Sequence, residues 1–246
     1  TYIVNKEEWA PALFFANKNH DVWLGNVRGN KHSRNHSILN PDKDKKFWNF
    51  SLDEMINKDI PEICHYISNL THKKINYIGH SQGSTLILAA LAEKNPIVLK
   101  TVEKILALGP VVFLQQAKKI NPLKNFVNNP LIETMISYLH PIEGEVLFPD
   151  FLKNTLVSAI CPRFKSICDA GFETLLELMA NIDPKVDYMK RSEVFMTHYP
   201  GGTSLKAVLH WYQNLKNEQE ILTKFDYGAE GNLEIYGKNE VDIYDF

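Results

Sequence analysis

One stretch decides the fold of this chain: Lys74-Ile75-Asn76-Tyr77-Ile78-Gly79-His80-Ser81-Gln82-Gly83-Ser84-Thr85. Its apolar part, residues 75–78, predicts a buried strand, and a run typical of a helix follows the sequence Gly-His-Ser-Gln-Gly. This is the G-x-S-x-G pattern of a nucleophile elbow, in which a tight turn between a strand and a helix presents a serine. The pattern predicts that Ser81 is a nucleophile.

Such a turn requires small residues on both sides of the serine. Gly79 and Gly83 have no Cβ atom that could clash where the strand and the helix fold back on each other. Ser81 then stands at the N-terminus of the helix, where backbone N–H groups and the helix dipole favour developing negative charge. The N–H of Gln82 is therefore the candidate donor to an oxyanion.

Composition narrows the class of protein. The 246 residues are 44% hydrophobic, which is enough for one large globular domain or for a core with a big insertion. The 27 basic and 29 acidic residues give a net charge of −2 and form no basic stripe, so no nucleic-acid partner is predicted. No apolar run approaches the ~18 residues that a membrane helix needs, so we expect a soluble chain without a transmembrane segment. No residue pattern indicates a metal or a cofactor.

Helical and strand patterns alternate around the elbow. The predicted helices are residues 7–19, a helix that begins near 52, a helix that begins near 59, and residues 86–92. The predicted strands are residues 21–26, 75–78 and 104–109. The capping-box spacing of Ser51 and Glu54 predicts the helix start at Leu52, and Asp59 is expected near the cap of the next helix, with Pro61 in its first turn. This alternation is typical of a doubly wound α/β sheet.

Beyond about residue 111 the pattern becomes helical, with no convincing core strand. The predicted helices cover residues 131–139, 151–160, 172–180 and 205–215. An all-helical block after an α/β strand is typical of a cap or lid over the carboxyl ends of the strands, where Ser81 also points. An ordinary helical second domain is the alternative. We therefore divide the chain into a partial core with the elbow, a helical cap or lid, and a return towards the core, at residues 1–111, 112–235 and 236–246.

Several short sequences together carry a resemblance to a known family. They are 21–26 with Arg28-Gly29-Asn30, Phe47-Trp48 with Phe50-Ser51, Asp53-Glu54-Met55, Asp59-Ile60-Pro61, 77–83, Ala107-Leu108-Gly109-Pro110, Gly201-Gly202-Thr203-Ser204 and His210-Trp211. These sequences resemble signatures of the acid lipases of the α/β-hydrolase fold, which include gastric lipase, lysosomal acid lipase and steryl ester hydrolases. The family usually has alanine where this chain has Gly109.

The resemblance implies a carboxylic ester hydrolase of lipid catabolism that acts on triacylglycerols or steryl esters at a lipid–water interface. It implies an α/β-hydrolase fold with an inserted helical cap whose apolar face meets lipid, and a place outside the cell or in the lysosomal or endomembrane lumen. Ser81 would be the nucleophile, and the Gln82 N–H one oxyanion donor. The alternatives are a non-catalytic lipid-binding relative, which the intact elbow disfavours, and a small-ester esterase or thioesterase, which the large cap disfavours.

The resemblance also indicates what this sequence lacks. The family takes its second oxyanion donor from an upstream His-Gly motif, and its triad acid and histidine from loops after two later strands. The chain begins at Thr1 without a signal peptide and ends at Phe246 without a closing element, so we expect a fragment without the triad acid and histidine that is poorly soluble and nearly inactive alone. None of its nine histidines is expected to be the base, and His210 is expected to anchor a helix against Trp211.

Three glycosylation sequons are consistent with a secretory protein. They are Asn35-His36-Ser37, Asn49-Phe50-Ser51 and Asn69-Leu70-Thr71. Asn69 is the strongest candidate, because it falls at the end of a predicted helix before a polar turn. Asn49 precedes the capping serine, so we expect it to be too buried for glycosylation.

The chain's three cysteines allow one direct test. The family carries a cap disulfide near Cys161 and Cys168, which implies that these two cysteines pair; metal binding is the alternative, but it would need more ligands. Cys64 falls on the apolar side of a predicted helix and is expected to be a buried free thiol. Thiol titration in denaturant without reductant should therefore find one thiol per chain, and a count of three would contradict the pairing.

Overall fold

The computed structural model describes residues 2, 3, 5–114, 128–131, 134, 144–146 and 201–246. Contacts divide the chain into two compact units. One comprises Thr1–Gly25 with Leu147–Gly202, and the other comprises Asn26–Val146 with Thr203–Phe246. The second unit contains the stretch around Ser81. Among the described residues, no helix is long and apolar enough to cross a membrane.

Proline sets the start of the helix in the first unit. Helix α1 spans Pro11–Ala16, which is shorter than the predicted 7–19. The preceding Ala10 is extended (φ −78°, ψ 112°), because the ring of Pro11 disfavours helical angles at the residue before it. The prediction tolerated Pro11 in the first turn but overlooked this effect on Ala10, so its helix began too early.

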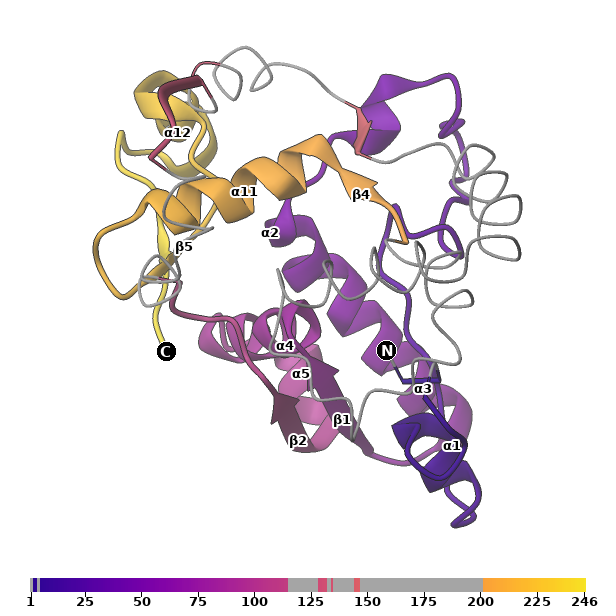
Figure 1. The fold of residues 1–246 in the computed structure, drawn as a ribbon. Helices are drawn as coiled ribbons and strands as arrows, with labels where there is room; N and C mark the ends of the chain where they lie inside the picture. Colours follow the sequence, from indigo (N-terminus) through magenta and orange to yellow (C-terminus); the bar gives the residue numbers. More distant parts are fainter. Residues whose placement is uncertain (1, 4, 115–127, 132–133, 135–143, 147–200) are drawn as a thin grey trace. The chain divides into compact units, whose positions relative to one another are not determined.

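A short parallel sheet lies at the centre of the second unit. Strand β1, Ile75–His80, pairs in parallel with β2, Val102–Leu108, from Asn76 opposite Lys104 to His80 opposite Leu108. Helices α4 (Gln82–Ala92) and α5 (Pro96–Thr101) make the crossover beside the strands (Figure 1). This strand–helix–strand unit confirms the α/β class predicted from the sequence.

The predicted strand over 21–26 is not found. A strand is defined by hydrogen bonds to a neighbour, and neither β1 nor β2 pairs with residues 21–26. Beyond residue 111 the described ladders are short and antiparallel, with two residues in each strand. They join β3 (Glu145–Val146) to β4 (Thr203–Ser204) and β5 (Leu222–Thr223) to β6 (Ile243–Tyr244).

One helical rod with a π turn leads towards the sheet. It consists of α2 (Leu52–Glu54), the π-helical turn η2 (Met55–Asp59) and α3 (Ile60–Thr71). The capping box is confirmed, because the Ser51 Oγ accepts from the Asp53 N–H at 3.0 Å and Glu54 accepts from the Ser51 N–H at 2.7 Å. A 3-10 turn, η1 (Lys45–Trp48), precedes it.

The expected cap at Asp59 is wrong. No break separates the two helices, because η2 continues the backbone from α2 into α3. The Asp59 carboxylate instead accepts from the backbone N–H and the Nε–H of Arg28, both at 2.8 Å. This ion pair ties the segment after Gly25 to the rod.

The core of the second unit fills the space between the rod and the sheet. Leu52, Met55, Ile56 and Ile60 meet α4, which contributes Leu86, Ile87, Ala89 and Ala90. Cys64 belongs to the same cluster and is free and fully buried, which confirms the expected buried thiol. Burial raises its pKa to about 11, so it is a thiol at neutral pH.

Helix α11, Leu205–Lys216, confirms the predicted helix over 205–215. Ser204 caps it by accepting from the Ala207 N–H at 3.0 Å and donates to the carbonyl oxygen of Phe50. His210, which is fully buried, accepts at Nδ1 from the Leu52 N–H (3.3 Å) and contacts the Thr223 oxygen through Nε2 (2.8 Å). These bonds fix α11 across the start of α2, as Figure 1 shows.

The other predicted cap helices cannot be compared with the structure. Residues 151–160 and 172–180 lie outside the described residues, as do Cys161 and Cys168. Of 131–139, residues 131 and 134 are described and are helical. The inserted cap and the three-part division of the chain therefore stay predictions.

Asp53 joins the C-terminal segment to the start of α2. One carboxylate oxygen accepts from the Tyr244 hydroxyl at 2.6 Å, and the other accepts from the Phe225 N–H at 2.9 Å. Burial, and next the Asp53 charge, raise the pKa of Tyr244, so the hydroxyl stays a donor throughout the neutral range.

Asp53→Ala should lower the free energy of unfolding by about 3 kcal/mol, because it leaves a buried hydroxyl and a backbone N–H without their charged acceptor. Urea denaturation measures the change. Glu103→Ala is the control, since Glu103 is exposed on β2 and should change stability by less than about 0.5 kcal/mol. Equal midpoints for the two variants would show that Asp53 does not hold the C-terminal segment.

Candidate active site

The backbone of Ser81 lies in a rarely occupied region. Its angles are φ 51° and ψ −120°, at the junction of β1 and α4. A side chain in such a region costs about 1–3 kcal/mol, and the conformation persists only where its surroundings fix it. Here the Ser81 N–H donates to the Leu108 oxygen at 2.9 Å, and the Ser81 carbonyl accepts from the N–H groups of Ser84 (2.9 Å) and Thr85 (3.2 Å).

Of the two glycines of the motif, only Gly79 is required by close contact in this structure. A Cβ at Gly79 would lie 2.7 Å from the Ser84 nitrogen and 2.8 Å from the carbonyl of Gly83. At Gly83 the nearest described atom would be the Tyr77 hydroxyl oxygen at 3.9 Å, which is ordinary contact. The predicted clash is therefore found at Gly79 and not at Gly83.

Polar side chains fix the first turn of α4 against both strands. The Tyr77 hydroxyl donates to the Gly83 oxygen at 3.0 Å. Thr85 donates to the Val111 oxygen at 2.8 Å, and the Ser84 hydroxyl is 3.3 Å from the Leu108 oxygen. Ser81 is thus held at the carboxyl ends of β1 and β2.

Ser81 and Gln82 occupy the positions that the motif predicts for a nucleophile and an oxyanion donor. The Ser81 side chain is partly exposed and does not cap α4. Gln82 is the first residue of α4, so its N–H has no acceptor within the helix. The helix dipole adds partial positive charge at this end.

The side chain of Gln82 has two partners that the sequence analysis missed. Its Oε1 accepts from the indole Nε1–H of Trp211 at 3.0 Å, and its Nε2 donates to the Met55 sulfur at 3.5 Å. The sequence marks Met55 only as part of a family signature, and it marks Trp211 as part of another and as the residue against which His210 is expected to anchor a helix. No spacing rule could have paired Trp211 with a residue 129 positions away.

None of the described histidines forms a hydrogen bond with Ser81. His210 uses one ring nitrogen for the Leu52 N–H and the other for the Thr223 oxygen, and burial lowers its pKa, so it is neutral and structural. The ring therefore anchors α11 through Leu52 and Thr223, whereas the prediction gave Trp211 as the partner. His198 lies outside the described residues, and within the described ranges no three metal-binding side chains gather at one point.

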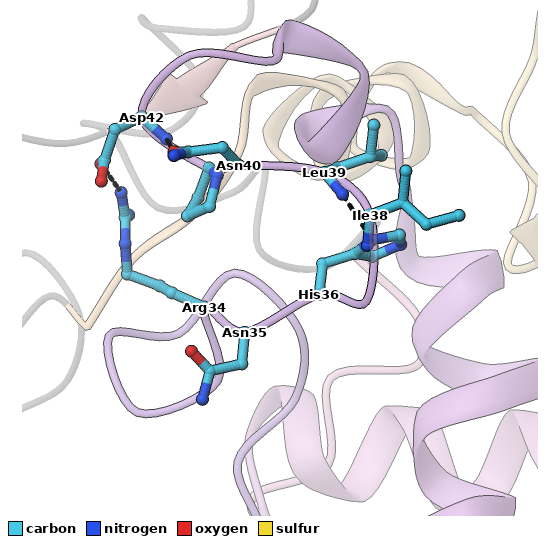
Figure 2. A pocket seen from close by; sticks show the side chains of 8 residues that line it. Arg34, Asn35, His36, Ile38, Leu39, Asn40 and Asp42 are labelled. Carbon is cyan, nitrogen blue, oxygen red and sulfur yellow. Dashed lines mark hydrogen bonds and ion pairs between the residues drawn. The ribbon is translucent and has the colours of Figure 1, made fainter.

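The asparagines of the three sequons are exposed. Asn35 is exposed at a surface hollow lined by Arg34, Asn35, His36, Ile38, Leu39, Asn40, Pro41 and Asp42 (Figure 2). Asn69 is exposed in the last turn of α3, where its amide nitrogen lies 2.9 Å from His65 Nε2. Asn49 is also exposed, contrary to expectation, and accepts from Lys206 Nζ at 3.0 Å.

Comparisons with known proteins agree on one family. A family model described as the alpha/beta hydrolase fold matches residues 3–119. The chain is 35% identical to lipase member K of Homo sapiens, with 92% of this chain and 54% of that protein covered. It is 31% identical to gastric triacylglycerol lipase of Bos taurus (99% and 59%) and 30% identical to lipase lipl-1 of Caenorhabditis elegans (100% and 59%). The chain thus spans little more than half the length of these relatives.

Gly79→Ala should destabilise the protein by about 3 kcal/mol, because the new methyl group meets backbone atoms that cannot move away. Gly83→Ala is the matched control: it adds the same methyl group inside a helix with free space, so it should leave stability unchanged or raise it by about 0.5–1 kcal/mol. Thermal unfolding of both variants tests the difference. Equal losses would mean that the elbow packs differently from this structure.

Proposed function

Because the chain belongs to the acid lipase family of the α/β-hydrolase fold, we propose that the protein hydrolyses carboxylic esters of neutral lipids with Ser81 as its nucleophile. The observation that carries the proposal is the backbone of Ser81, at φ 51° in a strand–turn–helix junction. Backbone strain of this kind is concentrated at functional sites. The turn that carries it presents the Ser81 hydroxyl at a helix N-terminus. A lipid-binding relative without catalysis would gain nothing from it.

The chemistry follows from the groups at the elbow. The Ser81 oxygen attacks the ester carbonyl carbon while its proton passes to a base, and the carbonyl oxygen becomes an oxyanion that accepts from the Gln82 N–H. Collapse of this intermediate releases the alcohol and leaves an acyl group on Ser81, which water then removes by the same route. We place the histidine base, its orienting acid and the second oxyanion donor outside the described residues.

The substrate class rests on the relatives and on the predicted cap. Gastric triacylglycerol lipase is named for a triacylglycerol substrate, and we extend this class to the present chain, together with steryl esters. A helical cap over Ser81 would give the acyl chains an apolar surface at the lipid–water interface. The sequons at Asn35, Asn49 and Asn69 support a secreted or lysosomal glycoprotein.

The test is covalent labelling of Ser81 by a fluorophosphonate, together with an assay on a long-chain ester. In the protein as its gene encodes it, Ser81→Ala should abolish labelling and lower kcat by a factor of about 10⁴ to 10⁶. Ser68→Ala removes a hydroxyl from α3, away from the motif, and should retain both the labelling and the kcat of the unaltered protein.

Labelling of a different residue, or full activity in Ser81→Ala, would refute the assignment. The 246 residues expressed alone provide a second comparison. We expect them to label slowly, and rapid labelling of Ser81 in that chain would show that a base lies within it.

A further inference from the structure

Two residues hold the side chain of Gln82, the residue whose backbone N–H is the proposed oxyanion donor. The indole N–H of Trp211 can only donate, so the amide atom 3.0 Å away must be the oxygen of Gln82. The amide nitrogen then faces the sulfur of Met55, a weak acceptor, at 3.5 Å. Both bonds are satisfied by one rotamer of Gln82, so the side chain has one defined orientation.

This orientation bears on the backbone N–H of the same residue. The direction of the Gln82 N–H depends on ψ of Ser81 and on φ of Gln82, and ψ of Ser81 is −120° in a strained region. A change in φ of Gln82 alone would tilt the N–H away from the carbonyl oxygen of a substrate. Because a change in φ of Gln82 that ψ of Ser81 does not compensate also moves the Gln82 Cβ relative to β1, a fixed side chain opposes that tilt.

The partner that holds Gln82 is itself firmly placed. Trp211 follows the buried His210, whose ring bridges the Leu52 N–H and the Thr223 oxygen. Trp211 also packs against the hydrophobic core of the second unit. Met55 is the first residue of the π turn η2 and is buried in that same core. Helix α11 therefore presents its indole N–H to the elbow from a rigid base.

We propose that Trp211 is a positioning residue for ester hydrolysis: its hydrogen bond to Gln82 keeps the Gln82 N–H directed at the oxyanion. This role rests on the proposed function of Ser81 and extends it to a residue on a distant helix. An indole that served only as core packing would contribute to stability. An indole that positions the donor contributes to the stability of the transition state, which kinetics can separate.

The experiment compares Trp211→Phe, which keeps an aromatic ring and removes the donor, with Trp9→Phe, which makes the same change at an exposed tryptophan outside the second unit. Both are made in the protein as its gene encodes it. Trp211→Phe should lower kcat on a soluble p-nitrophenyl ester by about 10- to 100-fold with KM within about twofold, because a displaced oxyanion donor costs transition-state stabilisation. Trp9→Phe should retain the kcat of the unaltered protein.

Two further readouts distinguish positioning from packing. The affinity for a trifluoromethyl ketone, which forms a tetrahedral adduct with the serine, should fall in Trp211→Phe by about the same factor as kcat. Gln82→Leu removes the acceptor and leaves the tryptophan in place, so it tests the bond even if Trp211→Phe unfolds. The double variant should be no slower than either single variant, because all three lose the same bond.

An unchanged kcat in Trp211→Phe, or additive losses in the double variant, would overturn the proposal. A lower urea midpoint without a change in inhibitor affinity would also overturn it, since that result describes packing alone. If the unaltered protein and Trp9→Phe neither hydrolyse esters nor react at Ser81, the proposed function fails and this role fails with it. If the unaltered protein hydrolyses esters and Trp211→Phe has the same kcat, the positioning role is refuted while the proposed function stands.

Discussion

The hydrogen bond from the Ser81 N–H to the Leu108 oxygen is the constraint on which the second unit depends. It continues the parallel ladder of β1 and β2 by one residue past the strand, into the turn itself. Because the serine is bonded to the neighbouring strand before the chain reverses into α4, its backbone cannot relax to ordinary angles without breaking the ladder. The fold therefore maintains the strain at Ser81.

A second set of contacts brings a distant part of the sequence to this turn. The neutral ring of His210 joins helix α11 to α2, and Ser204 joins it to Phe50 just before α2. From α11, Trp211 reaches Gln82. The buried polar groups in these contacts are satisfied by named partners, which is the condition under which a polar core is rigid rather than costly. The candidate site is thus built from the elbow together with a helix that lies within residues 112–235, the range predicted to form the cap.

Local chemistry explains which predictions succeeded. The capping box at Ser51 and the strand, turn and helix around Gly79 depend on neighbours within a few residues, and sequence patterns identify such features. The strand over 21–26 failed because pairing requires a neighbour that no local pattern specifies. Asp59 failed because an ion pair with Arg28 competes for the same carboxylate, and the Trp211 contact was missed because tertiary structure alone creates it.

The π turn at Met55–Asp59 has a consequence for the register of the whole rod. A π turn holds one residue more than the α-helix around it, so α2 and α3 are out of phase with a continuous α-helix by about 100°. Loss of any single residue from the turn would give a more regular helix. It would also rotate the Asp53 carboxylate and the Leu52 N–H away from Tyr244 and His210. The extra residue therefore sets the rotation of α2 relative to α3, so that α3 faces α4 while α2 faces α11.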